Sequence, residues 1–487
     1  MVGNGLDAGV LSRRLREFLR SSSPEVTMFR HMEDIVTRHR TRGWARTARE
    51  SPLRLFLAGY SGTGNIGADI RVAEMVRQLR YLFGPRAIAF ERLAVGDHGA
   101  AEPVPDVGVV KVDRYLPEVL EDRVTAADGV VACEGSMFKS SFSNVLALLL
   151  TGSLALASAQ HKLAVAWGAE AGEMDPLLSD FVERFCAEAL TVARNPASER
   201  LLAGLGLRTY LGADPAWTYW PAPRERAEEL LRSAGWDGTR PITCVCPVNP
   251  FWFPVRPDVG RVRELAGAAE DPADHFGALL FHEKSPESAR RYHAYLDQLA
   301  AALREHARST RFLVLVGMER LDRRACADLS ERLGGAVPIL TADELSAAET
   351  VAVLRRADLL VSSRYHAVLT ATPGLVPTVG VATDERIPNL MHELGRPDLC
   401  VAADAPDLET RLGQAIAAAG SDIDGLNAAQ GRLVAGQITR IGFGGRRVAE
   451  ELARLHPGFH RLDTGASWER FVPDVDPAVA GLLESNA

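Results

Sequence analysis

The chain has 487 residues, which is long for one ordinary domain and favours two or three. A composition of 47% hydrophobic and 24% charged residues is that of a globular protein and excludes wholesale disorder. The formal net charge of -8 offers a phosphodiester backbone no general attraction, so we do not expect a nucleic-acid-binding protein.

Cysteine usage and hydropathy favour a cytoplasmic protein. The six cysteines are scattered without a CxxC pair, which predicts reduced, mostly buried thiols. The N-terminus lacks the compact apolar core and cleavage site of a secretory signal. The most apolar segment, 144–159, is shorter than the roughly 20 residues that cross a bilayer. We therefore expect a buried helix there and no transmembrane segment.

The first 50 residues differ from the rest of the chain. Residues 1–50 are predicted to form a helical, arginine-rich arm whose arginines are either solvated or meet a partner helix or an anionic surface. The apolar face of this arm comprises Leu11, Leu15, Phe18 and Leu19. From residue 53 onward, short apolar runs alternate with helical segments, a pattern that predicts a parallel sheet covered on both faces. We place the first α/β domain at 51–236, with strands at 53–60, 87–93, 129–133, 162–168 and 190–194.

The alternation resumes after the turn-forming link at 236–241. A second α/β domain is predicted at 239–420, and its last strand lies in 372–382. The tail, 421–487, begins helical and is then interrupted by Pro and Gly. The predicted fold is thus α/β, with two doubly wound, Rossmann-like domains facing across a cleft. Such sheets bind ligands beyond the carboxyl ends of their strands, so we expect the ligand-binding residues in the loops that follow strands.

A glycine-rich turn follows the first strand. It satisfies GxGxxG between a strand and a helix, where backbone amides can hold a phosphate or carboxylate. Its candidate anion- or acceptor-binding residues are Gly62, Gly64, Asn65, Gly67 and Asp69. A tight turn without a ligand is the alternative. Glu91, predicted to end the next strand, resembles the acidic ribose ligand of a dinucleotide fold and leaves a nicotinamide enzyme open.

A second post-strand loop, 133–141, gathers hydroxyl groups and one of only four lysines in the chain. That composition suits an anionic ligand, although a helix N-terminus with its lysine in solvent would look the same. The candidates in this loop are Glu134, Gly135, Ser136 and Lys139. Arg194 stands at a later strand end, where it either faces the cleft or makes a structural ion pair.

The most informative segment is an apolar strand that runs directly into Ser-Ser-Arg-Tyr-His and then a helix. Arg364 is the residue type that binds carboxylate or phosphate with two hydrogen bonds. His366 titrates near neutral pH and can move protons. The loop 383–386 adds charges that bind substrate or pair with one another. The aromatic run 251–253 forms an acceptor wall or simply packs, and no motif predicts a metal.

These segments, in this order, resemble the polysaccharide pyruvyl transferase family over residues 53–395. The family's GxGNxGD-like turn, Gly-rich loop, R-D/E-x-x-S, D-P-A, S-R-x-H-A and G-x-P elements correspond to Gly62 to Gly67, the Cys133-Glu-Gly-Ser136 loop, Arg194 to Ser198, Asp214 to Ala216, Ser363 to Ala367 and Gly374 to Pro377. The Arg-Tyr-His segment with its flanks is the most specific part of the match.

The resemblance implies a GT-B-like architecture and transfer of the enolpyruvyl carbons of phosphoenolpyruvate to a sugar as a pyruvate ketal. Phosphoenolpyruvate would be a co-substrate, and no separate cofactor is implied. By the same resemblance Arg364 binds the donor anion, and His366 contacts the donor or acts as a general acid. Further donor contacts would be Arg194, Ser363 and Arg386. The early glycine turn would face the acceptor, a glycan or sugar-like molecule.

The chain also departs from the family pattern. Ala68 displaces the acidic residue after the glycine turn to Asp69, Cys-Glu-Gly-Ser replaces an all-glycine loop, and Arg386 stands where a lysine is common. Three other functions therefore stay open: a nucleotide-sugar glycosyltransferase, a non-catalytic binding protein, and the nicotinamide enzyme, which leaves Arg-Tyr-His unexplained. The acceptor, the oligomeric state and the role of residues 1–50 are not indicated.

Overall fold

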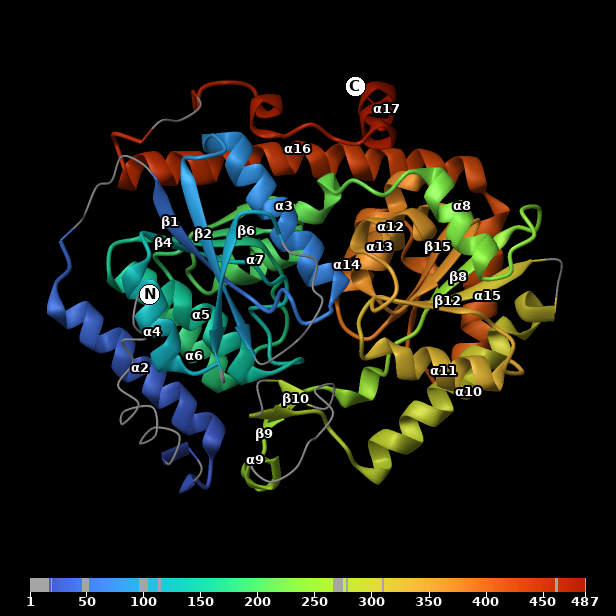
Figure 1. Cartoon of the computed structure of the whole chain (residues 1–487), viewed down its shortest axis with the longest axis horizontal. Helices are drawn as coiled ribbons and strands as arrows, with labels where there is room; N and C mark the ends of the chain where they lie inside the picture. The colour runs from blue at the N-terminus through green and yellow to red at the C-terminus, as the bar shows by residue number, and fades with distance from the viewer. Residues whose placement is uncertain are drawn as a thin grey trace.

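The molecule is built around two parallel sheets, as Figure 1 shows. Each sheet with the helices that pack on it is called a half, the first and the second in chain order. The computed structural model describes residues 17–18, 20–45, 52–95, 104–112, 115–265, 275–276, 279–308, 311–459 and 463–486. The first sheet has seven strands in the order β3-β2-β1-β4-β5-β6-β7, and the second has six in the order β13-β12-β8-β14-β15-β16. Neighbouring strands are parallel throughout both sheets, which confirms the predicted fold class.

The strands of the first sheet are β1 (Leu53–Ala58), β2 (Ile88–Val95), β3 (Val107–Val112), β4 (Gly129–Ala132), β5 (Leu163–Ala169), β6 (Leu190–Ala193) and β7 (Thr209–Leu211). Every residue of β4 and β5 is buried, as a strand covered on both faces requires. The five predicted strands are confirmed. The sequence analysis missed β3, a largely exposed edge strand, and β7, which has three residues. It also misplaced Glu91, which lies within β2 opposite Phe56 rather than at the strand end.

Helices cover both faces of this sheet: α2 (Pro24–Arg42), α3 (Ile66–Phe83), α4 (Pro117–Ala126), α5 (Asn144–Ala159), α6 (Pro176–Phe185) and α7 (Pro196–Gly204). The buried helix predicted at 144–159 is confirmed, because α5 packs against α2, α4 and α6 and is enclosed along almost its whole length. Among the helices of the described residues, none is both long and apolar enough to cross a bilayer. Phe18 is buried with Met28 and Phe29 of α2, whereas the predicted Leu11, Leu15 and Leu19 lie outside the described residues.

The second sheet contains β8 (Ile242–Cys246), β12 (Phe312–Gly317), β13 (Ile339–Thr341), β14 (Leu359–Ser362), β15 (Thr378–Ala382) and β16 (Cys400–Ala402). Its helices are α8 (Arg224–Ser233), α10 (Pro286–Arg308), α11 (Asp322–Arg332), α12 (Ala347–Arg355), α13 (Tyr365–Ala371), α14 (Arg386–Glu393) and α15 (Leu408–Ser421). The prediction that β15 is the last strand is wrong, since the short β16 follows it. α8 packs against α12 although it precedes the link at 236–241, so the division of the chain there stays a prediction.

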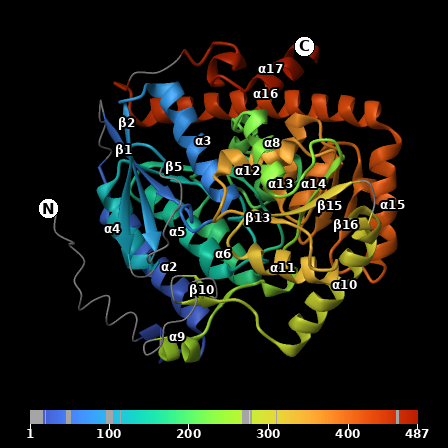
Figure 2. The same cartoon turned by 45° about the vertical axis from the view of Figure 1, so that its right-hand side comes forward.

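Segments from late in the chain return to the first sheet. Helix α16 (Ile423–Leu455) runs along both halves, as two views show (Figures 1 and 2). Its Val434 and Ile438 belong to the core of the second sheet, and its Val448 and Leu452 belong to that of the first. The 3₁₀ helix η6 (Trp468–Phe471) and α17 (Pro477–Ser485) pack back on α16. Helix α16 therefore packs on both halves.

A small antiparallel sheet, which lies between β8 and α10 in the chain, packs against the first half. It consists of β9 (Arg256–Pro257), β10 (His275–Phe276) and β11 (Leu280–Phe281), and α9 (Val259–Leu265) adjoins it. Val255 and Leu280 join the core under α5 of the first half. All six cysteines are free and five of them are buried, which confirms the prediction of buried thiols.

Candidate functional site

The glycine turn after β1 contacts the loop that follows β12 of the second sheet. Gly62 and Gly64 have φ values of 91° and 81°, a backbone conformation that glycine adopts at little cost. Asn65 caps α3 by accepting a hydrogen bond from the Ala68 amide at 3.1 Å, and Asp69 accepts one from the Gly62 amide at 2.6 Å. The predicted polar residues of this turn thus hold its own backbone. The Gly64 carbonyl accepts from the Arg320 amide of the second half at 3.1 Å.

The loop after β4 packs inward. Glu134 accepts a hydrogen bond from the Tyr60 amide at 2.9 Å, and burial raises the pKa of its carboxyl group. Gly135 lies against Arg194 so closely that a Cβ atom would stand 2.5 Å from Arg194 Nη1. Ser136 is half-buried, and its hydroxyl group makes no hydrogen bond to a described residue. Glycine at 135 therefore allows the close approach of Arg194.

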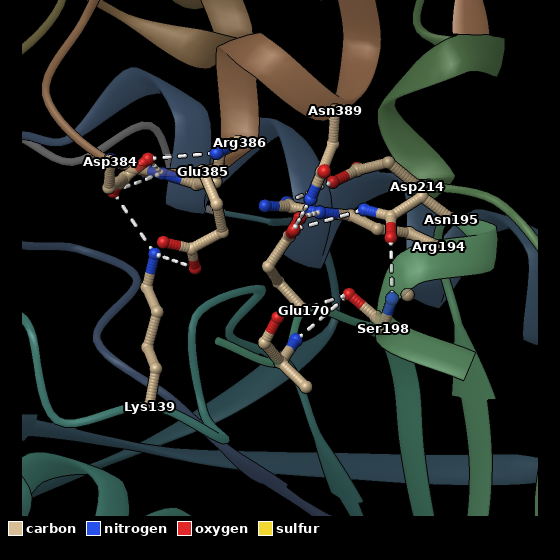
Figure 3. A network of polar contacts seen from close by, with 12 residues as sticks. Lys139, Glu170, Arg194, Asn195, Ser198, Asp214, Asp384, Glu385, Arg386 and Asn389 are labelled. Carbon is tan, nitrogen blue, oxygen red and sulfur yellow. Dashed lines mark hydrogen bonds and ion pairs between the residues drawn. The ribbon is translucent and has the colours of Figure 1, made fainter. Parts of the chain in front are cut away.

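Lys139 is buried and joins the two halves (Figure 3). Its Nζ lies 3.0 Å from Asp384 Oδ2 and 2.9 Å from Glu385 Oε1. Arg386 binds Asp384 as well, with Nε 2.8 Å from Oδ2. Burial lowers the pKa of Lys139, and Asp384 opposes that effect. The charges of 139 and 383–386 thus pair with one another across the two halves in this structure.

Arg194, which follows β6, is enclosed by acids and an aromatic ring. Its Nε donates to Glu170, and its Nη1 donates to Asp214 Oδ2 at 2.9 Å. The guanidinium lies 4.2 Å from the ring centroid of Tyr365. Nη2 is buried and has no hydrogen-bond partner among the described residues. Burial lowers the pKa of Arg194, but Glu170, Tyr365 and Asp214 outweigh it, so the pKa stays above its ordinary value and the side chain is charged.

Asp214 connects Arg194 to two further side chains. It caps the 3₁₀ helix η1 (Pro215–Thr218) by accepting from the Ala216 amide at 3.0 Å. Its Oδ2 also accepts from Arg71, a buried residue of α3 whose Nη2 donates to the Trp167 carbonyl at 2.8 Å. Burial alone would raise the pKa of Asp214, but Arg71, His366 and Arg194 hold it well below its ordinary value. Asp214 is therefore an anion.

His366 stands in the first turn of α13, between Asp214 and the glycine turn. Its Nε2 lies 3.5 Å from Asp214 Oδ2. On the other side, a Cβ atom on Gly67 would come within 2.3 Å of Nδ1. Burial lowers the pKa of His366 to about 4, although Asp214 opposes the shift. The imidazole is consequently neutral near pH 7 in this structure.

Arg364 caps the same helix but faces a different pair of acids. Its Nε and Nη2 bind Asp322, and Nη2 lies 2.7 Å from Glu319 Oε2. Burial raises the pKa of Asp322, against the opposing effect of Arg364. Among the described residues, none accepts a hydrogen bond from Arg364 Nη1. The neighbouring Ser363 is buried, and its hydroxyl group lies 3.0 Å from that of Tyr295.

The structure thus gathers the predicted residues into three groups. His366 and Arg194 contact Asp214, with Gly67 against His366 and Gly135 against Arg194. Arg364 lies beside Glu319 at the glycine turn, and Lys139 meets Arg386 through Asp384. Asn389 of α14 links the first and third groups, because its amide donates to Glu170 Oε1 at 2.9 Å (Figure 3). Ser363 points toward Tyr295, away from these groups. Glu134 and Asp69 are engaged with backbone amides.

Sequence reasoning missed several members of the site: Arg71, Glu170, Glu319, Asp322 and Asn389. Two of them carried a usable signal, since Glu170 follows β5 and Glu319 comes shortly after β12, at the sheet edge where ligands bind. Arg71 lies four residues after Gly67 on α3 and thus shares a helix face with it. Nothing local marks Asn389.

The remaining candidates lie at the edge of the second sheet. A pocket of about 340 Å³ is lined by Phe251, Phe253, Arg291 and Thr383, among others. Phe251 is buried while Trp252 and Phe253 are half-buried, so the aromatic run both packs and lines a pocket. Within the described part of the chain, no three His, Cys, Asp or Glu side chains are placed to hold a metal ion.

Comparisons with known proteins agree with this fold. The family model for polysaccharide pyruvyl transferase matches residues 10–385. No curated protein matches the chain. Among solved structures, S. aureus MnaA, in a co-structure with UDP, is 10% identical with a TM-score of 0.50, and the match covers 83% of this chain and 97% of that chain. A UDP-glucosyltransferase from Polygonum tinctorium is 12% identical with a TM-score of 0.46 over 84% of this chain and 99% of that one.

E. coli ADP-heptose lps heptosyltransferase II is also similar, at 14% identity and a TM-score of 0.36 over 75% of this chain and 98% of that chain. At 10% identity, the match to MnaA shows a similar fold alone. The two parallel sheets have the GT-B-like arrangement expected from the sequence.

Proposed function

Because the chain belongs to the polysaccharide pyruvyl transferase family, we propose that it transfers the pyruvyl group of phosphoenolpyruvate to a sugar-like hydroxyl acceptor. The observation that carries the proposal is the grouping of His366 with Arg194 through one buried carboxylate, with Arg364 two residues away in the chain. These groups supply what a small dianionic or trianionic donor needs: guanidinium donors and a group that moves protons.

The donor would bind between the two arginines. Arg194 has a buried Nη2 with no hydrogen-bond partner among the described residues. Arg364 has an Nη1 from which none of the described residues accepts a hydrogen bond. A carboxylate or phosphate oxygen on these atoms would satisfy both. Arg386 and Lys139 would contact the donor only if they released Asp384, so we assign them a smaller part.

Water would not be a reactant in the proposed reaction. An acceptor hydroxyl oxygen forms a bond to C2 of phosphoenolpyruvate, and C3 gains a proton to become a methyl group. The C2–O bond to phosphate then breaks, a second hydroxyl oxygen bonds to C2, and its proton leaves with the phosphate. One phosphoenolpyruvate and one diol thus give one pyruvate ketal and one inorganic phosphate.

His366 would carry the first proton. Burial lowers its pKa to about 4, so the imidazole starts neutral and accepts the hydroxyl proton before it donates one to C3. Arg194 and Arg364 would hold the donor while its charge redistributes toward the leaving phosphate. The acidic partners of Arg364, Glu319 and Asp322, would limit how strongly the ground-state donor binds.

Calorimetric titration of phosphoenolpyruvate tests the proposal. We expect the wild-type protein to bind it and Arg364→Gln to lose at least tenfold in affinity. Arg356→Gln is the matched control, because Arg356 precedes β14 as Arg364 follows it. Both side chains are 17% exposed, and each is paired with two acids. The control should bind like the wild type.

Uridine diphosphate in a parallel titration separates the alternatives. If the protein binds uridine diphosphate but does not bind phosphoenolpyruvate, the pyruvyl-donor assignment is overturned in favour of a nucleotide-sugar glycosyltransferase. Equal loss of phosphoenolpyruvate binding in Arg356→Gln would show that the effect is not specific to the proposed site.

A further inference from the structure

The pocket of about 340 Å³ lies at the edge of the second sheet, beyond the carboxyl ends of three strands. Pro250 follows β8, Ala382 ends β15, and Ala403 follows β16. The side chains that give this sheet-edge pocket its chemistry are Phe251, Phe253, Glu283, Glu287, Arg291 and Asp404. Open α/β sheets bind ligands at this edge, and small-molecule sites have volumes of roughly 300–1,000 Å³. We propose that the sheet-edge pocket binds an uncharged sugar unit of the acceptor.

The aromatic side of the pocket is held in place by neighbouring side chains. Phe253 is half-buried and meets the ring of Phe142 edge-on, with the ring centroids 4.8 Å apart. Phe251 is buried, and its centroid lies 6.4 Å from that of Tyr295 and 4.3 Å from Cζ of Arg291. These contacts fix both rings before any ligand binds. One face of a sugar ring presents C–H groups, which pack favourably on such aromatic surface.

The polar side of the pocket suits hydroxyl groups better than phosphates. Three acids and one arginine are among its described lining residues. Asp404 lies 3.6 Å from Arg291, and Glu287 also has an arginine partner. Glu283 is exposed to the pocket, and no described residue pairs with its carboxylate. A carboxylate accepts hydrogen bonds from sugar hydroxyl groups, whereas its charge repels a diphosphate.

The pocket adjoins the charged group that joins the two halves. Thr383 lines the pocket and precedes Asp384 in the chain. Asp384 binds both Lys139 and Arg386 (Figure 3). These two cations lie 4.5 and 4.6 Å from the centroid of the Phe142 ring, which the aromatic side of the pocket contacts. A sugar in the pocket would thus lie beside the outer contacts proposed for the donor, and an acceptor must bind next to its donor. The inference rests on the proposed function for the role of acceptor, but not for the binding of a sugar.

Saturation-transfer NMR of the full chain tests sugar binding without phosphoenolpyruvate. The ligands are glucose, galactose, mannose and N-acetylglucosamine, with uridine diphosphate as the anionic comparison. We expect at least one of the sugars to bind, and Phe253→Ala to lower its affinity about tenfold, because an apolar packing surface is lost.

Trp252→Ala is the matched control. Trp252 directly precedes Phe253 and is also half-buried. Both rings contact His282, with centroid distances of 5.1 Å for Trp252 and 5.5 Å for Phe253. Trp252, however, lines a neighbouring pocket instead. This variant should bind the sugar like the wild type.

Glu283→Ala keeps the test decisive if Phe253→Ala does not fold. The Glu283 side chain is exposed and unpaired within the described residues, so its removal leaves the fold intact. Sugar affinity should fall about tenfold, because hydrogen bonds to a charged group are lost. Glu331→Ala, at another exposed glutamate of the second half whose side chain pairs with no described residue, should change nothing.

Three results would overturn the inference. The first is the absence of saturation transfer from all four sugars, and the second is an equal loss of affinity in Trp252→Ala. The third is binding of uridine diphosphate that Phe253→Ala abolishes, because the pocket would then be a nucleotide site. Since phosphoenolpyruvate is absent from these measurements, failure of the donor assignment would leave a sugar-binding result intact.

Discussion

Arg194 and Arg364 occupy comparable places, each at the carboxyl end of a strand of its own sheet, β6 and β14, yet their surroundings differ. Arg194 is 1% exposed and binds Glu170 and Asp214, and Asp214 also binds Arg71. Two arginines thus meet two acids, so the group is balanced in charge, and one N–H donor of Arg194 is left over. Arg364 is 17% exposed and faces Asp322 and Glu319 alone, so its group carries an excess negative charge if both acids are ionised. Topology places the arginine, but the neighbouring acids decide how much of its charge a ligand meets.

Removing each arginine should separate the two groups most strongly. Arg194→Met leaves Glu170 and Asp214 buried with half their partners, and we expect the free energy of unfolding to fall by about 3–5 kcal/mol. Arg364→Met should cost about 1–2 kcal/mol, because the raised pKa of Asp322 lets that acid take up a proton more readily. Urea denaturation at pH 7.5 measures both. Equal losses would mean that burial and charge balance do not distinguish the groups.

The pH dependence of stability should differ in sign between the groups. The pKa of His366 is lowered from 6.5 to about 4, so the unfolded chain takes up its proton first and stability falls as pH drops through this window. Between pH 7.5 and 5 the loss from this residue is about 2 kcal/mol. His366→Gln should lack it, which urea denaturation at both pH values would show.

Asp322 should act in the opposite direction. Burial raises its pKa, so the folded chain binds the proton first and the penalty for ionising Asp322 is relieved as pH falls. Between pH 5 and pH 7.5, Asp322→Asn should therefore lose less stability than the wild type loses. His366→Gln should gain the most stability over the wild type at pH 5. A His366→Gln profile parallel to that of the wild type would contradict the assignment of a neutral, buried imidazole.

The smallest expected effect concerns the dependence of Arg194 on the second sheet. Asn389→Ala removes the hydrogen bond to Glu170 Oε1, while Asn195 still donates to the same oxygen at 3.0 Å. We expect a loss of about 1 kcal/mol in the free energy of unfolding. Asn486→Ala is the control and should cost less, because it removes only the 2.8 Å hydrogen bond that the side-chain amide donates to the Leu482 carbonyl of α17. A loss of 3 kcal/mol or more would mean that the second half holds the Arg194 group together.

The fold was predictable where the sequence shows short, buried apolar runs. β4 and β5 are of this kind, and the turn chemistry around them marks their ends. β3 was not predicted because an exposed edge strand has no continuous apolar run. β7 and β16 were not predicted because each is only three residues long. Strand length and burial, rather than position in the chain, thus decided which strands could be recognised.

The candidate site was predictable in its strand-end residues and not in their pairing. Arg194, Arg364 and His366 stand out because each follows an apolar run. Of their partners, Glu170 and Glu319 also follow strands, whereas Arg71 occurs mid-helix and Asn389 lies 219 residues from Glu170 in the chain. Charge pairing across such separations depends on how the sheets pack, which no local pattern encodes. Lys139 illustrates the point: either solvent or a ligand was expected, and two acids of the second half surround it.

Helix α16 has a consequence for how the chain is made. Its last turns supply Val448 and Leu452 to the core of a sheet whose final strand ends at Leu211, so that core is completed only by residues synthesised much later. At roughly 5–20 residues per second, a ribosome needs tens of seconds to cover the interval. During that time α3 covers only part of this apolar core, and chaperones have that interval in which to shield the part that α16 later completes.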